Sequence, residues 1–178
     1  MGQIIHVSIK GISPLLQHRY ADEPVDLPTK RVSGKRDFSA ESGNALYQTP
    51  EGVIYQPSSH LERAMMKSAA KFQIGGRGKK TYKDLFQCAV IVSPDIITHK
   101  IQNYVVDRRP VIIQRARVMR ERPRFDEWGL DFQIEIFDDQ VKPEVVNEVL
   151  VDCGKYVGIG DYRPKFGRFM VTKFEVKR

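Results

Sequence analysis

The chain has 178 residues, of which 41% are hydrophobic and 29% are charged. This length and composition allow a buried core, exclude wholesale disorder and predict a single domain, residues 1–178. Lys and Arg outnumber Asp and Glu by 29 to 22, giving a net charge of +7. That balance favours an anionic partner such as nucleic acid, although a soluble protein that is merely basic has the same balance.

The sequence contains no signal for membrane insertion or metal binding. Its N-terminus lacks a basic leader and a long apolar run, so we expect a cytoplasmic protein with no membrane partner. Cys88 and Cys153 lack the spacing of zinc ligands and have no paired histidine. We therefore expect no metal and no cofactor.

The first half of the chain predicts one strand, one long excursion and one helix. Apolar and polar residues alternate over 4–11, which is typical of a half-buried strand. Residues 14–57 are irregular and too long for a simple connection, which indicates a functional insertion. Ser59 and Glu62 have the spacing of a helix capping box, and apolar residues then recur at helical spacing as far as Phe72.

Two strands and a second insertion are predicted next. The apolar, β-branched run over 85–92 favours a central strand. A second insertion spans 93–129, and within it 111–125 has the pattern of a strand with a turn at Pro123. Residues 130–137 then alternate cleanly, as a strand with one buried face does.

A helix and a strand complete the predicted order. Pro143 suits the first position of a helix, and residues 168–176 read as the last strand. The order strand, helix, strand, strand, helix, strand predicts an α+β, ferredoxin-like βαββαβ fold. In that fold an antiparallel sheet carries two helices on one face, which leaves its other face open to a ligand.

Arginine is concentrated between residues 108 and 124. Only Asp107 and Glu121 oppose the charge nearby, and a strand over 111–119 would place Arg115 and Arg117 on one face. Clustered guanidinium groups repel each other unless anions lie between them, and RNA phosphates supply such anions. The alternative is a solvated hairpin with scattered salt bridges. The cluster consists of Arg108, Arg109, Arg115, Arg117, Arg120, Arg122 and Arg124.

Two glycine-rich segments also carry cations. The segment 75–80 contains Lys79 and Lys80, and a flexible loop of this kind can follow a phosphate chain. The segment 156–169 has closely spaced glycines, which allow close backbone approach to a ligand or to the protein's own core. Its candidate RNA-binding residues are Gly158, Gly160, Tyr162, Arg163, Lys165, Gly167 and Arg168.

Three segments resemble the RAMP superfamily of CRISPR-associated proteins. "VGIGDYRPKFGRF" at 157–169 is similar to the family's C-terminal glycine-rich loop, and "GVIYQPSSHLERAMMKSAAKF" at 52–72 to the start of its first helix. "IIHVSIKGISPLL" at 4–16 is similar to its first strand and turn. Ser58 stands where the family often has Gly, and Arg168 interrupts the family's second glycine cluster. These departures indicate a divergent or mobile-element-encoded member.

The resemblance implies a non-catalytic backbone subunit that repeats along guide RNA as a homo-oligomer or filament, beside other CRISPR-associated subunits. It also implies that the first insertion, which includes Arg19, contacts neighbours and RNA, and that 93–129 forms a thumb-like hairpin. The expected RNA-binding set is then the two glycine-rich segments and Arg19, together with Arg108, Arg109, Arg115, Arg117, Arg120 and Arg122.

Two other functions are compatible with the sequence. Some relatives cut RNA without a metal, with a histidine as general acid or base, and His18 is the best local candidate. Certain backbone subunits cut target RNA with an aspartate in the first insertion, and Asp22 or Asp26 could occupy that place. A structural phage or virus assembly protein with a basic surface is the third reading.

Overall fold

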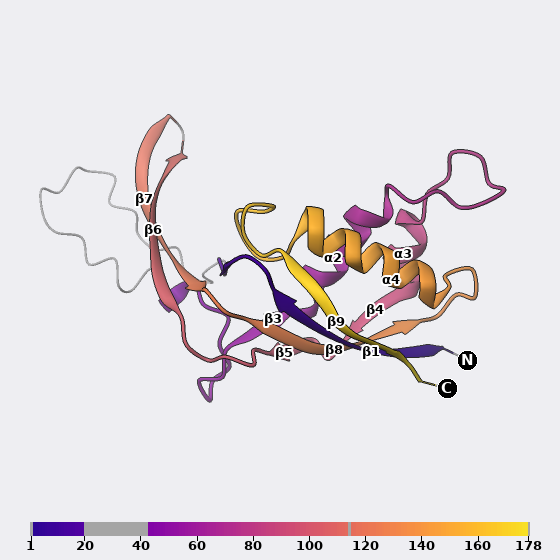
Figure 1. Ribbon diagram of the computed structural model, residues 1–178. Coiled ribbons are helices and arrows are strands. Elements are labelled where there is room, and N and C mark those ends of the chain that lie inside the picture. The colour runs from indigo at the N-terminus through magenta and orange to yellow at the C-terminus, as the bar shows by residue number, and fades with distance from the viewer. Residues whose placement is uncertain (1, 20–42, 114, 178) are drawn as a thin grey trace, which may run out of the picture.

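The main sheet of the protein is antiparallel, with its strands in the order β4–β8–β1–β9. The computed structural model describes residues 2–19, 43–113 and 115–177, and all statements of structure concern these residues (Figure 1). The first and third strands of the predicted order are central, as the ferredoxin-like fold requires. The strands are β1 (Gln3–Gly11), β4 (Val90–Ser93), β8 (Gly129–Ile136) and β9 (Phe169–Val176).

The helices cover one face of this sheet (Figure 1). They are α2 (Ser58–Ala69), the short α3 (Lys83–Ala89) and α4 (Pro143–Asp152), which continues into a π-helical turn over Cys153–Val157. This arrangement confirms the predicted ferredoxin-like fold.

The core lies between the sheet and these helices because alternate strand residues face the same way. Ile5 of β1 and Ile134 of β8 are fully buried there, against Leu61 of α2 and Leu150 of α4. Apart from Ile4, the residues that alternate with them along β1 and β8 are polar and lie on the face that carries no helix.

Two sequence-based assignments were wrong. The run 85–92 begins inside α3, where Phe86 and Ala89 are buried three residues apart, and becomes a strand only at Val90. A short apolar run does not by itself distinguish a buried helix turn from a strand. Pro123 lies within β7 rather than at a turn.

The predicted capping box does not form. The helix α2 begins at Ser58, and no side chain caps its first turn. Instead, Glu62 Oε1 accepts a hydrogen bond of 3.0 Å from the backbone N–H of Val92. A residue predicted to stabilise its own helix therefore links that helix to the edge strand β4.

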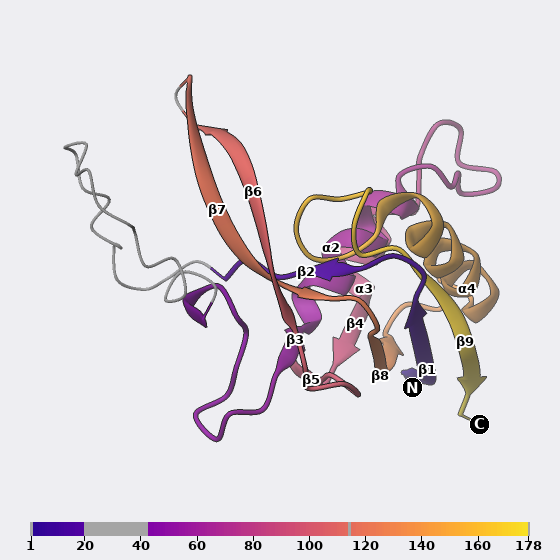
Figure 2. The same cartoon turned by 60° about the vertical axis from the view of Figure 1, so that its left-hand side comes forward.

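The two predicted insertions contain the remaining strands. β2 (Leu15–Leu16), β6 (Val105–Ile113) and β7 (Ala116–Phe125) form a sheet of order β2–β7–β6. β3 (Tyr55–Pro57) pairs with β5 (Ile96–Thr98). The β6–β7 hairpin extends away from the main sheet in both views (Figures 1 and 2). In the described residues, no helix is long and apolar enough to cross a membrane.

Two isoleucines on adjacent strands test this packing. Ile134 is fully buried, whereas Ile91 is 46% exposed. We expect Ile134→Ala to lower the free energy of unfolding by about 3 kcal/mol, because it leaves a cavity in the core. Ile91→Ala is the matched control and should cost less than about 1 kcal/mol. Urea unfolding measures both, and equal losses would contradict the assigned faces of the sheet.

Candidate nucleic-acid interface

The glycine-rich loop after α4 packs against the turn between β1 and β2. The backbone N–H groups of Asp161 and Gly167 donate to the carbonyl oxygens of Leu16 and Pro14, each over 2.8 Å. Within the loop, the N–H of Ile159 donates to the carbonyl of Gly167 over 2.9 Å. These three amides therefore bind the protein's own backbone rather than a ligand.

Gly160 and Gly167 are required by this close approach. Their φ angles are +78° and +74°, a region that side chains with a Cβ rarely adopt. A Cβ at Gly160 would overlap the carbonyl oxygen of Leu16, and one at Gly167 would overlap that of Ile159. Of the two uses of glycine that the sequence allowed, the structure supports core packing at these positions.

The outer side of the loop is cationic. Arg163, Lys165 and Arg168 are exposed. Tyr162 is 51% exposed, and its ring lies 5.9 Å from that of the buried Phe166, nearly edge-on. The loop thus presents charge and one accessible aromatic ring above a fixed backbone.

The base of the β6–β7 hairpin contacts this loop. The Arg122 Nε atom lies 2.8 Å from Asp161 Oδ2 as an ion pair, although the two groups are not aligned for a hydrogen bond. The Arg109 guanidinium lies 4.6 Å from the centre of the Phe166 ring, a cation–π contact. The structure therefore brings together the arginine-rich and glycine-rich segments, which are far apart in the sequence.

Carboxylates neutralise the arginines at the base of the hairpin. The buried Asp107 accepts hydrogen bonds from Arg109, one of them over 3.0 Å, and from Arg124 over 3.4 Å. Burial acts to raise the pKa of Asp107, but the hydrogen bonds and charges of these two arginines lower it below its usual value. The buried Glu121 pairs with Arg108. These arginines need no external anion, contrary to the inference from clustering.

The hairpin tip differs from its base. Arg115 lies in the turn with φ +67°, so it does not share a strand face with Arg117 as predicted. Both side chains are exposed, and within the described residues neither has a recorded ion pair. Ile112, which is opposite Arg117 in the hairpin register, is 74% exposed. The tip thus combines cations with uncovered apolar surface.

The start of α2 carries one exposed arginine, Arg63, which was not among the residues selected from the sequence. Burial lowers the pKa of His60, and the positive charges of Arg163 and Arg63 lower it further. Burial raises the pKa of Tyr47, against the charges of Arg19 and Arg63. The charges of Arg63 and of Arg163 on the glycine-rich loop therefore act on the same imidazole, that of His60.

Two of the remaining candidates are separated from this surface. Lys79 and Lys80 lie in the α2–α3 loop, at the opposite side of the protein from the hairpin in both views (Figures 1 and 2). His18 is exposed just after β2, and Asp22 and Asp26 lie outside the described residues. The described ranges contain no cluster of three or more potential metal ligands.

A pair of glycines with nearly equal φ tests the loop packing. Gly160 (+78°) lies against Leu16, whereas nothing lies within 4 Å of a Cβ placed on Gly76 (+73°). Both Gly→Ala variants strain the backbone, but only Gly160→Ala also creates a clash. We expect it to lower the free energy of unfolding by about 2 kcal/mol more than Gly76→Ala, as core overpacking does. Thermal and urea unfolding measure the difference, and equal stabilities would contradict close packing.

No protein-family model matches the sequence, and no curated protein matches it. The fold is similar to that of a chain in the cryo-EM structure of the Type III-B Cmr-beta bound to cognate target RNA, with a TM-score of 0.63 and 13% identity. The alignment covers 99% of this chain and 61% of the other, so this chain spans less than two thirds of its neighbour's length. The likeness shows that the protein has the ferredoxin-like fold that the RAMP resemblance implied.

Proposed function

We propose that the protein binds single-stranded RNA, without cutting it, as a subunit of a CRISPR-type ribonucleoprotein. The observation that carries this proposal is the contact between the arginine-rich hairpin and the glycine-rich loop through Arg122 and Asp161. It holds two cation-bearing segments, which are far apart in the sequence, next to each other in the fold. The fold similarity to a chain of an RNA-bound assembly agrees with this function.

The charge distribution assigns different roles to the arginines. Arg108, Arg109, Arg122 and Arg124 hold the base of the hairpin in place through carboxylates of the same chain. Arg115 and Arg117 at the tip, and Arg163 and Arg168 on the loop, are exposed to solvent. RNA phosphates would supply anions for these exposed groups and release bound counterions.

Tyr162 gives the surface a stacking position. Its ring is half-exposed beside the cations of the loop, and a base can stack on such a ring whatever its identity. This arrangement favours binding of single strands with little sequence preference, as a subunit that repeats along a guide RNA requires.

The exposed apolar surface of the hairpin is an argument for contact with a neighbouring subunit. Both of its strands carry exposed apolar side chains, including Val105, Ile112 and Met119. An uncovered two-stranded ribbon of this kind is marginally stable alone and gains stability when another surface covers it. We propose that a neighbouring copy or another CRISPR-associated subunit covers it along the RNA.

Two double variants with the same charge change test the RNA-binding surface. We expect Arg115→Ala/Arg117→Ala to weaken binding of a labelled single-stranded RNA about tenfold or more, and to reduce the slope of log affinity against log salt by about 1.4. Fluorescence anisotropy at several salt concentrations measures both quantities. Lys79→Ala/Lys80→Ala, on the opposite side, is the control and should change affinity less than about threefold.

Equal losses in the two variants would reject the hairpin as the binding surface. If the unmodified protein binds no RNA even at low salt, the RNA-binding proposal fails and the assembly-protein reading gains support.

A separate assay distinguishes binding from cleavage. We expect a labelled RNA to remain intact when it is incubated with the unmodified protein, and the His18→Ala variant to behave in the same way. Cleavage by the unmodified protein that disappears in His18→Ala would show a metal-independent ribonuclease instead.

A further inference from the structure

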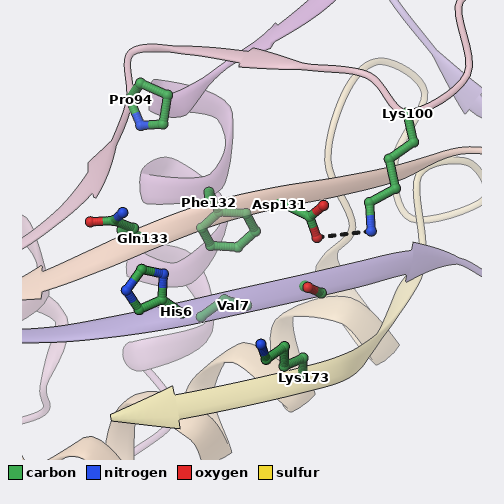
Figure 3. Close-up of a pocket in the computed structure, with 9 residues that line it drawn as sticks. His6, Val7, Pro94, Lys100, Asp131, Phe132, Gln133 and Lys173 are labelled. Atoms are coloured by element: carbon green, nitrogen blue, oxygen red, sulfur yellow. Dashed lines mark ion pairs between the residues drawn. The ribbon is translucent and has the colours of Figure 1, made fainter. Parts of the chain in front are cut away.

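A polar cavity of about 420 Å³ opens on the helix-free face of the main sheet (Figure 3). The sheet forms its floor, and the segment that carries Pro94 and Lys100 passes above it (Figure 3). The cavity volume lies within the range typical of small-molecule sites. It belongs to neither the hairpin nor the glycine-rich loop.

The strand register explains which side chains reach the cavity. His6 is opposite Gln133, and Ser8 is opposite both Asp131 on β8 and Lys173 on β9. Because alternate residues of neighbouring strands share a face, polar side chains of three strands meet there. The sheet thus supplies the polar floor of the cavity, and the segment that carries Pro94 and Lys100 covers it.

Each of the two lysines at this site is paired with a carboxylate: Lys100 with Asp131, and Lys173 with Glu175, whose Oε2 lies 3.0 Å from Lys173 Nζ. Lys100 Nζ lies 2.8 Å from Asp131 Oδ1, and both side chains are partly exposed. Burial acts to raise the pKa of Asp131, but hydrogen bonds from Lys100 and Ser8, and the charges of Lys100 and Lys173, lower it. Both lysines therefore act on the same carboxylate.

This charge pattern selects the class of ligand. A bare phosphate ion is attracted by the lysines but repelled by Asp131 and Glu175, the carboxylates paired with them. A ligand that combines an anionic group with hydroxyl or N–H donors fits the site better. Its anionic group can bind the lysines, and its donors can form hydrogen bonds to a carboxylate.

The floor of the cavity also offers the hydrogen-bonding side chains of His6 and Gln133. His6 Nε2 is buried and has no hydrogen-bond partner among the described residues. The side chain of Gln133 lies beside it and can both donate and accept (Figure 3). A buried polar atom without a partner is costly, and a ligand that binds it removes that cost.

We propose that this cavity binds a nucleoside monophosphate unit. The lysines hold its phosphate, Asp131 accepts hydrogen bonds from its ribose hydroxyls, and Gln133 and His6 bind the edge of its base. The ring of Phe132 belongs to the core, so hydrogen bonding rather than stacking holds the base. This site goes beyond RNA binding by the hairpin and does not depend on it.

Nuclear magnetic resonance titration of the full chain tests the proposal. Adenosine and uridine monophosphates are added separately, and inorganic phosphate is the reference probe. We expect saturable shifts of the His6 ring and of the β1 and β8 amides for a nucleotide, with inorganic phosphate at least about tenfold weaker.

Two single lysine variants separate a specific site from general charge. We expect Lys173→Ala to weaken nucleotide binding about tenfold, since it removes a charge-assisted contact. Lys173 is exposed and pairs with the exposed Glu175, so its removal leaves the core intact but also leaves Glu175 without this ion pair. The control is Lys10→Ala on β1, which removes the same charge outside the cavity and should change affinity less than about twofold. Equal weakening by both variants, or no saturable shift with either nucleotide, would overturn the proposal.

Competition with a short single-stranded RNA identifies the source of the nucleotide. If RNA displaces the monophosphate, the cavity holds one unit of the bound strand, and if both bind together, it holds a free nucleotide. We expect the Arg115→Ala/Arg117→Ala variant to bind the nucleotide as the unmodified protein does. Its RNA binding tests the hairpin, and its nucleotide binding tests the cavity.

Discussion

The position of the candidate interface depends on the backbone packing around the turn at Pro14–Leu16. On one side, the glycine-rich loop donates its Asp161 and Gly167 amides to this turn. On the other, Leu15 and Leu16 pair with the end of β7 as strand β2. Because both contacts are made by backbone groups at short range, they fix the hairpin and the loop relative to the main sheet.

That constraint determines which arginines are paired with carboxylates and which are exposed to solvent. Where the hairpin meets the body, buried or half-buried carboxylates neutralise the arginines, since unpaired charges are costly away from water. At the hairpin tip, the side chains of Arg115 and Arg117 are exposed to solvent, so they need no carboxylate partner. One cluster of similar residues therefore contains both structural ion pairs and the cations that we propose for RNA.

The two faces of the main sheet differ chemically because side chains along a strand point alternately to opposite faces. Alternation along β1 and β8 places Ile5 and Ile134 under the helices and His6 and Gln133 on the opposite face. The uncovered face is therefore polar around His6 and Gln133. It becomes a cavity only because the segment through Pro94 and Lys100 passes over it.

The sequence by itself determined the fold class, because strand alternation and helical spacing are local patterns that the core enforces. It also identified the arginine-rich and glycine-rich segments as unusual. It misassigned 85–92, since a run that short fits either a helix or a strand. Only the tertiary structure separated the arginines that are paired with carboxylates from the exposed ones at the hairpin tip, and placed Lys79 and Lys80 far from that hairpin. Those outcomes depend on contacts between residues far apart in the chain, and no local pattern encodes such contacts.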